Sequence, residues 1–358
     1  MGNNIYIFTS SYKPVLGGLQ TVCTQLAETL VARGEKVIVV TSLRKVAPKP
    51  FEKIDGVRVC RFNYNWRFLT YWLLVLLFFF KRPKAVYAHS TLDECYYIRK
   101  LRGRFIFKLV TCFHGHDVLT YDDGYSKDSD LYRNQKSLIG VSDKICACSN
   151  YLAKVVERVF SIRNVQYVYN GVDLSRFKIL HSSPCEYQYV FSFGRLEAVK
   201  GFDLLIEAFA QLNGYDNLHL LIAGDGSQRN NLSAQIQKLG LQDRIKLIGR
   251  KTPEEVVAYA QNAKVIVIPS LREAFGIVVL EAIAAKRPIV AIESSGGIPE
   301  ILDDRFGILV PSSAEGLRSG IELVLTEGVK SDASCVEEYL NNFSIEKMVN
   351  HYLSLIDN

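Results

Sequence analysis

Residues 4–41 read NIYIFTSSYKPVLGGLQTVCTQLAETLVARGEKVIVVT, in which two apolar runs flank a segment of helical periodicity. The first run predicts a strand, and apolar residues then recur at helical spacing from Leu19 to Leu30. Gly34 ends that helix, and residues 36–41 form a continuous, mostly β-branched strand. Uninterrupted apolar strands that alternate with helices are typical of a parallel sheet covered on both faces. The stretch therefore predicts a βαβ unit and assigns the chain to the α/β class.

The same alternation continues on both sides of a polar, turn-prone run from Lys178 to Glu186, where we place a domain boundary. Before this run, strands are expected at 57–62, 85–89, 107–113 and 144–149. After it, strands are expected at 189–193, 219–223, 245–248, 265–269 and 289–291. We therefore predict two doubly wound domains, residues 1–178 and 187–343, in a chain of 358 residues that is long enough for both. The amphipathic tail 344–358 is expected to pack back on the first domain.

Composition excludes several classes of protein. Hydrophobic residues make up 48% and charged residues 22% of the chain, which excludes a disordered, collagen-like or coiled-coil protein. The eight Cys show neither a dense disulfide framework nor paired C-x-x-C ligands, so we interpret them as buried small side chains in a reducing compartment. The apolar run at the N-terminus is too short for a signal peptide and lacks a basic region before it, so a cytoplasmic protein is expected.

The charge is divided unequally along the chain. Residues 1–180 carry 27 Lys or Arg and 14 Asp or Glu, whereas residues 181–358 carry 16 and 23. The basic half contains Phe68–Phe80, an uncharged run that would be roughly 20 Å long as a helix and thus too short to cross a bilayer. Such a run next to basic residues suits the surface of an anionic membrane. The alternative is a buried core helix surrounded by solvated charged faces.

Two loops of the second domain have residues that suit a nucleotide diphosphate. Gly194 follows a strand and lets the backbone approach a ligand closely, while Arg195 and Lys200 bring positive charge to the same loop. A plain solvent-facing loop is the alternative. Gly224 and Gly226 follow the next strand in a G-x-G pattern. A dinucleotide fingerprint needs Gly or Ala where Arg229 stands, so we interpret this pattern as a tight turn that approaches a nucleotide.

The stretch EAFGIVVLE, residues 273–281, contains two carboxylates in an apolar setting. Glu281 lies in a helix with apolar neighbours, where a carboxylate is costly unless it is hydrogen-bonded. Ribose hydroxyls would satisfy it, and Glu273 in the preceding loop could accept hydrogen bonds from sugar hydroxyls. The alternative is that both carboxylates are satisfied within the protein.

In the first domain, His114-Gly115-His116-Asp117 follows a strand. His114 can hydrogen-bond a sugar or a phosphate at the sheet edge. A metal site is the alternative, but the loop lacks a further ligand cluster. We interpret the D-x-D pattern at Asp128-Ser129-Asp130 as a solvated loop, because it does not follow a strand.

Taken in order, these blocks resemble the retaining glycosyltransferases of family four, which have the two-domain GT-B fold. The resemblance covers nearly the whole chain. It rests on Gly17-Gly18, His114–Asp117, Asn170-Gly171-Val172-Asp173, the Gly194–Gly201 loop, Gly224-Asp225-Gly226, the Glu273/Glu281 pair after Pro269-Ser270, and Gly296-Gly297-Ile298-Pro299-Glu300.

The resemblance implies a role for each of these residues. Arg195 and Lys200 would hold the donor diphosphate, Glu281 the ribose and Glu273 the transferred sugar. His114 would be the active-site histidine beside the donor sugar. Further donor-binding roles fall to the backbone around Gly17, Gly18, Gly194, Gly224, Gly226, Phe275, Gly276 and Ile277.

The implied reaction has a physical logic. The leaving diphosphate gains negative charge, and Arg195 and Lys200 would stabilise it without a metal ion. We therefore expect no metal and no cofactor, with a UDP- or GDP-linked sugar as co-substrate, and we favour attack from the face of departure because no protein nucleophile is evident.

The leading hypothesis is a hexosyltransferase that acts on a glycan or lipid-linked acceptor in cell-surface polysaccharide biosynthesis, such as that of lipopolysaccharide or capsule. It would be cytoplasmic and peripheral on the anionic inner membrane face, with no nucleic-acid partner. Two alternatives stay open, namely a transferase with a soluble small-molecule acceptor and a catalytically silent nucleotide-sugar-binding subunit.

Overall fold

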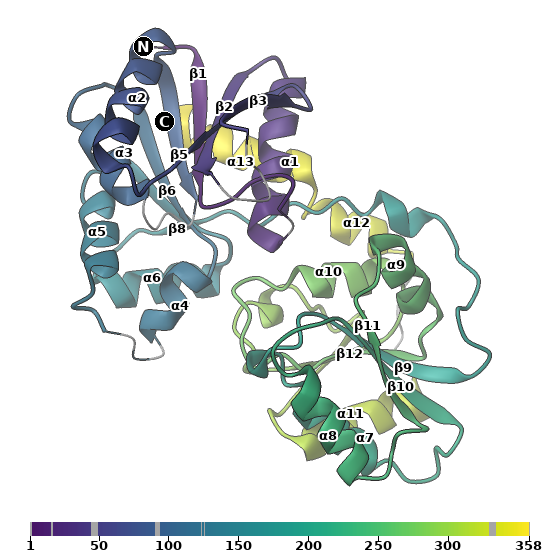
Figure 1. Cartoon of the computed structure of the whole chain (residues 1–358). Helices are drawn as coiled ribbons and strands as arrows, with labels where there is room; N and C mark the ends of the chain where they lie inside the picture. The colour runs from purple at the N-terminus through teal and green to yellow at the C-terminus, as the bar shows by residue number, and fades with distance from the viewer. Residues whose placement is uncertain are drawn as a thin grey trace. The chain divides into compact units, whose positions relative to one another are not determined.

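The computed structural model describes residues 2–15, 17–43, 49–89, 94–122, 124, 126–328 and 334–357. The chain divides into two compact units. Unit 1 comprises Met1–Val172 and Phe343–Asn358, and unit 2 comprises Asp173–Asn342. Each unit has its own sheet with helices packed against it (Figure 1). The prediction of two parallel α/β sheets is confirmed.

Unit 1 contains an eight-stranded sheet in the order β3-β4-β2-β1-β5-β6-β7-β8. Its strands are β1 (Asn4–Thr9), β2 (Lys36–Ser42), β3 (Phe51–Ile54), β4 (Val57–Phe62), β5 (Pro83–His89), β6 (Lys108–Phe113), β7 (Lys144–Ala147) and β8 (Gln166–Tyr167). Its helices are α1 (Gly18–Ala32), α2 (Arg67–Phe80), α3 (Glu94–Arg102), α4 (His116–Asp122), α5 (Asp130–Ile139), α6 (Asn150–Phe160) and α13 (Ile345–Asp357). All six residues of the central strand β1 are buried, as expected for a strand covered on both faces.

One strand of this sheet departs from the prediction of parallel strands alone. β3 pairs with β4 in the antiparallel sense. Its sequence, FEKI, is half exposed and carries two charges, because β3 is an edge strand with one neighbour. Continuous apolar runs, which mark the buried strands of this sheet, are therefore no guide to β3.

The C-terminal helix α13 belongs to unit 1. The Tyr87 hydroxyl of β5 donates to the carbonyl oxygen of Tyr352 at 2.6 Å, and the two rings meet edge to face. Arg33, after α1, donates to the side chain of Asn350 at 2.7 Å. These contacts tie the end of the chain to the centre of the first sheet.

Unit 2 contains a six-stranded parallel sheet in the order β11-β10-β9-β12-β13-β14. Its strands are β9 (Gln188–Phe193), β10 (Leu218–Ala223), β11 (Ile245–Gly249), β12 (Val265–Ile268), β13 (Ile289–Ile292) and β14 (Gly307–Val310). Its helices are α7 (Phe202–Ala210), α8 (Arg229–Lys238), α9 (Pro253–Asn262), α10 (Ile277–Ala284), α11 (Ala314–Glu327) and α12 (Val336–Asn341), with short 3₁₀ turns η1 (Ser175–Lys178), η2 (Ala198–Lys200) and η3 (Ile298–Glu300). Sequence reasoning did not single out β14 or α11.

The crossing between the units lies at Val172 and Asp173, before the polar run at which we expected it. The reason is a set of hydrogen bonds that hold the following segment to α9 in unit 2. The Gln261 amide donates to the carbonyl oxygens of Phe177 and Ile179 at 3.0 and 2.9 Å. Composition indicates a turn-prone stretch, but packing determines that this stretch belongs to unit 2.

Within the described residues, no helix combines the length and the apolarity that crossing a membrane requires.

Candidate active site

The order of strands in unit 2 defines where a ligand would bind. β9 lies between β10 and β12, so the chain moves outward from β9 to β10 and β11 and then returns to β12 on the other side. In open α/β sheets, ligands bind beyond the carboxyl ends of the strands at such a reversal point. The loop after β9 carries Arg195 and Lys200, and the loop after β12 carries Glu273. The topology therefore brings these predicted residues to one edge.

Lys200 and Glu273 form an ion pair across this edge. The Lys200 ammonium donates to Glu273 Oε1, and the Ser270 hydroxyl donates to the same oxygen at 3.0 Å. Both charged side chains are largely buried. The Glu273 backbone is fixed as well, because its N–H donates to Ser295 O at 2.7 Å and its carbonyl accepts from Gly297 N at 2.9 Å. The carboxylate is thus held in place on a braced loop.

The position of Lys200 depends on the glycine that follows it. Gly201 has a φ of +62°, and a Cβ atom there would lie 2.2 Å from the carbonyl oxygen of Pro269. Only glycine allows the η2 turn to pack so closely on the loop after β12. Arg195, in contrast, is exposed on the same loop.

Glu281 in α10 pairs with Arg176, a residue that sequence reasoning missed. The Arg176 guanidinium donates to Glu281 Oε1 from the η1 turn. Burial raises the pKa of the Glu281 carboxyl, and the positive charge of Arg176 opposes that rise. The carboxylate is therefore satisfied within the protein, which was the alternative to ribose hydroxyls, and its ribose role stays a prediction. No local pattern indicates a pair whose members are 105 residues apart.

Two glycines of unit 2 are required by packing between loops. A Cβ atom on Gly224 would lie 1.8 Å from the carbonyl oxygen of Gly194, and one on Gly226 would lie 2.5 Å from that of Leu196. The loop after β10 thus rests directly on the loop after β9. Packing between the loops thus accounts for both glycines, and the approach of this G-x-G turn to a nucleotide stays a prediction.

The remaining predicted residues of unit 2 lie around the N-terminus of α10. Gly276 precedes the helix with a φ of +103°, Phe275 is buried before it, and Ile277 is the first helical residue. The unpaired N–H groups of a first turn favour an anion.

Unit 1 has a reversal point of its own, between β1 and β5. Gly17 and Gly18 stand at the start of α1, which follows β1, and both are exposed. A Cβ atom on Gly18 would meet nothing within 4 Å. The approach to the N-terminus of α1 is therefore open at this residue.

His114, after β6, contacts a second histidine that sequence reasoning missed. His89 Nδ1 and His114 Nε2 are 2.8 Å apart, and the two rings stack. His89 ends β5 and is fully buried. Burial lowers the pKa of His114 to about 4 and lowers that of His89 strongly. Both imidazoles are therefore neutral at pH 7, and one donates its N–H to the other.

The Asp117 carboxylate is held by the backbone of the loop that follows β6. Asp117 accepts from the backbone N–H of Gly115 at 2.8 Å and of His114 at 3.2 Å. In the described part of the chain, no group of three His, Cys, Asp or Glu side chains is placed to hold a metal ion.

The D-x-D pattern is exposed to solvent, as expected, but only its first part is a loop, because the pattern runs into a helix. Asp130 is the first residue of α5, and the Ser129 hydroxyl accepts from the Tyr132 N–H at 3.2 Å as an N-cap. The pattern thus starts a helix, which is the usual place for Ser and Asp.

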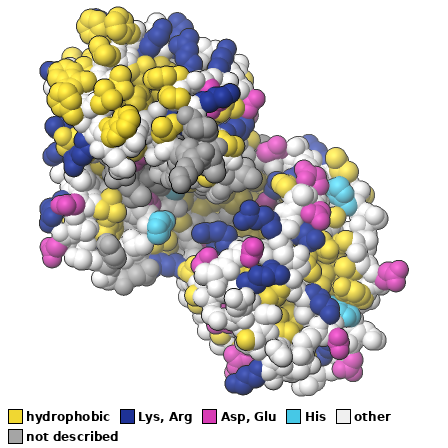
Figure 2. All heavy atoms as spheres, viewed as in Figure 1, with side chains coloured by type: hydrophobic (Ala, Val, Ile, Leu, Met, Phe, Trp, Pro, Cys, Tyr) yellow, Lys and Arg dark blue, Asp and Glu magenta, His cyan; other side chains and the backbone are white. Residues whose placement is uncertain are grey.

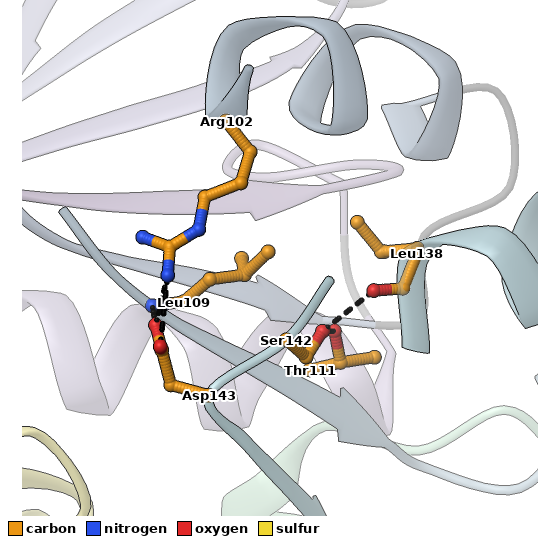
Figure 3. Close-up of polar contacts among 6 residues, drawn as sticks. All are labelled: Arg102, Leu109, Thr111, Leu138, Ser142 and Asp143. Carbon is orange, nitrogen blue, oxygen red and sulfur yellow. Dashed lines mark hydrogen bonds and ion pairs between the residues drawn. The ribbon is translucent and has the colours of Figure 1, made fainter. Parts of the chain in front are cut away.

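The strand that leads to His114 is anchored at its other end (Figure 3). The Asp143 carboxylate accepts from Arg102 at 2.8 Å and from the Leu109 N–H at 2.7 Å. The hydroxyls of Thr111 and Ser142 lie 2.7 Å apart. These contacts fix β6 against the turn before β7.

Comparison with known proteins agrees with this geometry. The family model for glycosyl transferases group 1 matches residues 177–340, and the model for glycosyltransferase family 4 matches residues 16–176. The two matches meet between residues 176 and 177, four residues after the crossing from unit 1 to unit 2, and together account for nearly the whole chain.

Individual relatives match along most of this chain. An uncharacterized glycosyltransferase of Methanocaldococcus jannaschii is 29% identical over 353 residues, 90% of this chain and 89% of that one. A human phosphatidylinositol N-acetylglucosaminyltransferase subunit is 25% identical over 354 residues, 95% of this chain and 72% of that one. Among solved structures, Anabaena HepE in complex with UDP and glucose aligns with a TM-score of 0.77 at 19% identity, covering all of both chains.

Proposed function

Because this chain belongs to the family 4 glycosyltransferases, whose architecture is the GT-B fold, we propose that it is a retaining hexosyltransferase that uses a UDP- or GDP-linked sugar. The observation that carries the proposal is the Lys200–Glu273 ion pair at the reversal point of the second sheet, beside the exposed Arg195. A related fold binds UDP and glucose, which supports a nucleotide-sugar donor.

The diphosphate would bind to Arg195 and Lys200. As the bond between sugar and diphosphate breaks, negative charge develops on the leaving group, and both cations stabilise it. Lys200 is already held by Glu273, so its ammonium needs little rearrangement. The N-terminus of α10 adds its N–H groups. This set supplies the positive charge without a divalent ion, so we propose that the reaction is metal-independent.

The two glutamates would recognise different parts of the donor. Glu281 would accept hydrogen bonds from the ribose hydroxyls, most strongly as an ionised carboxylate, and Arg176 favours that ionised form. Glu273 would accept hydrogen bonds from hydroxyls of the transferred sugar while it remains paired with Lys200.

His114 would contact the donor sugar as a neutral imidazole. Burial lowers its pKa to about 4, which favours the neutral ring near pH 7, so we assign it the role of a hydrogen-bond partner. Gly17 and Gly18 would offer backbone N–H groups at the open start of α1.

For the acceptor, we propose a glycan or glycolipid of cell-surface polysaccharide biosynthesis. The human relative is named for transfer of N-acetylglucosamine to phosphatidylinositol, which supports a lipid-linked acceptor. A soluble small-molecule acceptor is the competing assignment.

The experiment is a release assay with EDTA present, in which purified protein is incubated with UDP- and GDP-hexoses and a membrane extract, and free nucleotide is measured. The proposal predicts release from one nucleotide class, and an acceptor product that keeps the anomeric configuration of the donor. If nucleotide is released without the extract and the sugar is transferred to a soluble alcohol or sugar, the result favours the competing assignment of a soluble acceptor. If the protein binds a nucleotide sugar but does not turn it over, the conclusion is that it is a non-catalytic binding protein and not an enzyme.

A further inference from the structure

Helix α2 exposes an apolar face. We call this the α2 face and define it by side chains that are 37 to 79% exposed: Phe68, Leu69, Trp72, Leu73, Leu76, Phe79 and Phe80. At about 100° per residue, these positions fall within an arc of about 140° of the helix. Trp66, at the N-cap, is 63% exposed. Figure 2 shows hydrophobic side chains gathered over this region of unit 1.

The opposite face of α2 already supplies the packing that holds the helix. Thr70, Leu74 and Phe78 are buried. The Phe78 ring contacts Tyr6 at a centroid distance of 4.5 Å, and the Tyr6 hydroxyl donates to the Lys81 carbonyl at 2.7 Å. The α2 face is therefore not needed for the core of unit 1. Contiguous apolar surface of this kind marks an interaction site in a soluble domain.

Basic residues surround the α2 face. Residues 66–108 hold nine Lys or Arg and two acidic residues, one of which, Glu94, is buried. The Arg104 guanidinium lies 5.3 Å from the Trp72 ring, and Arg67 lies 4.2 Å from the ring of Tyr96 in α3. Lys81 and Arg82, directly after α2, are exposed as well.

We propose that the α2 face docks on the surface of an anionic lipid membrane, with α2 lying in the interface and the basic residues against lipid head groups. Three features select lipid over a protein partner. The apolar stripe consists of Phe, Trp and Leu, the residues that enter the acyl boundary. Trp66 and Trp72, whose rings belong to the type enriched at membrane–water interfaces, are both exposed on or beside this face. The surrounding charge is predominantly positive, which complements anionic head groups.

This inference goes beyond the proposed function and does not depend on it, because a lipid surface would hold the protein whatever its donor or acceptor.

The chain contains its own probe. Trp66 and Trp72 are its only two tryptophans, and both lie on or beside the α2 face. The full chain is titrated with vesicles of phosphatidylcholine alone, or of phosphatidylcholine with about one-third phosphatidylglycerol. We expect a blue shift of tryptophan emission and quenching by brominated lipid, with at least about tenfold tighter binding to the anionic vesicles that added salt weakens. Unchanged emission with anionic vesicles overturns the proposal.

Two double variants locate the contact. F79S/F80S should weaken vesicle binding by more than about tenfold and leave far-UV circular dichroism unchanged, since both side chains are exposed. The matched control, I179S/L180S, removes two exposed apolar side chains of unit 2 and should bind as the parent does. Equal binding by both double variants contradicts a contact through α2.

Light scattering tests the other occupants. Parent protein that ignores vesicles but forms a dimer that F79S/F80S abolishes would assign the face to a second copy and overturn the proposal. A monomer that ignores vesicles overturns it too, and leaves a protein partner.

Discussion

The reversal points of the two sheets have the same topology, but the polar side chains near them are charged in unit 2 and neutral in unit 1. In unit 2, the ion pair Lys200–Glu273 lies between the loops after β9 and β12, and the pair Arg176–Glu281 joins the η1 turn to α10. In unit 1, His89 and His114 meet as neutral rings, because burial lowers the pKa of both. Paired charges suit a charged ligand, whereas neutral rings suit the hydroxyls of a sugar. The difference shows that the order of the strands determines where each site lies, whereas burial and local partners determine whether its side chains are charged.

The largest expected effect comes from removing a charge of unit 2. We expect Lys200→Ala to lower the rate of sugar transfer by about 10²–10³, the usual loss when a group that stabilises the leaving charge is removed. Steady-state release of nucleotide measures it. Lys251→Ala, which breaks the exposed pair with Glu255, is the matched control and should retain the parent rate. An equal loss of transfer rate in both variants would contradict a specific role of Lys200 in stabilising the leaving group.

The next largest effect concerns stability, and it compares a packed glycine of unit 2 with an open one of unit 1. Gly224→Ala places a Cβ atom 1.8 Å from a backbone oxygen, so we expect a loss of about 3 kcal/mol or more in the free energy of unfolding. Gly18→Ala, at the open start of α1, meets nothing within 4 Å and should change stability by less than about 1 kcal/mol. Urea unfolding of both variants checks this. A Gly224→Ala protein as stable as the parent would show that the two loops do not rest on each other.

The histidine pair of unit 1 makes the stability of the folded protein depend on pH, because burial favours the neutral form of both rings. A histidine with a folded-state pKa of about 4 is neutral in the folded protein, so its stabilisation is present above pH 6.5 and is lost as pH falls towards 4. For His114 this amounts to up to about 3 kcal/mol.

Unfolding free energies of the parent and of the double variant H89Q/H114Q, measured from pH 4 to 8, test this expectation. The variant should lose less stability on acidification than the parent, whatever its stability at pH 8. His116→Gln, a change of an exposed neighbour, should follow the parent curve. Parallel curves for the parent and the double variant would place the titration elsewhere.

The smallest expected effect comes from Arg176→Gln. Removal of the guanidinium leaves the Glu281 carboxyl with a pKa that burial raises further, at a cost of about 1–3 kcal/mol near pH 7. A carboxyl with a raised folded-state pKa destabilises the folded state as pH rises, so the gap to the parent should grow from acid to neutral pH. Nucleotide affinity should fall in the same variant. Arg318→Gln, which breaks the partly exposed pair with Glu322 within α11, is the control. A difference between Arg176→Gln and the parent that does not change with pH would contradict the assignment.

Strands and site loops differ in how well the sequence predicts them. Strands such as β2, with a continuous β-branched run, were predicted because burial on both faces leaves a strong pattern. β3 was not, since an exposed edge strand carries a mixed pattern. In the site, the charged and glycine residues were predicted from loops that follow strands.

Their partners were not predictable. Arg176 and His89 are ordinary residues in their local sequence, and only the fold brings them to Glu281 and His114, 105 and 25 residues away. The same holds for Gly224, whose neighbour is a backbone oxygen of another loop. Sequence patterns thus indicate which loops carry the chemistry, while the contacts that set each group's charge depend on tertiary structure.

The central claim is that the reversal point of unit 2 binds the nucleotide of the donor. Calorimetric titration of UDP and GDP into the parent, Glu281→Gln and the control Glu322→Gln tests it most directly. The account predicts that the parent and the control bind one nucleotide with the same affinity, and that Glu281→Gln binds it about tenfold or more weakly because a charged acceptor of ribose hydroxyls is lost. Equal affinity in all three proteins, or no binding to any, would contradict it.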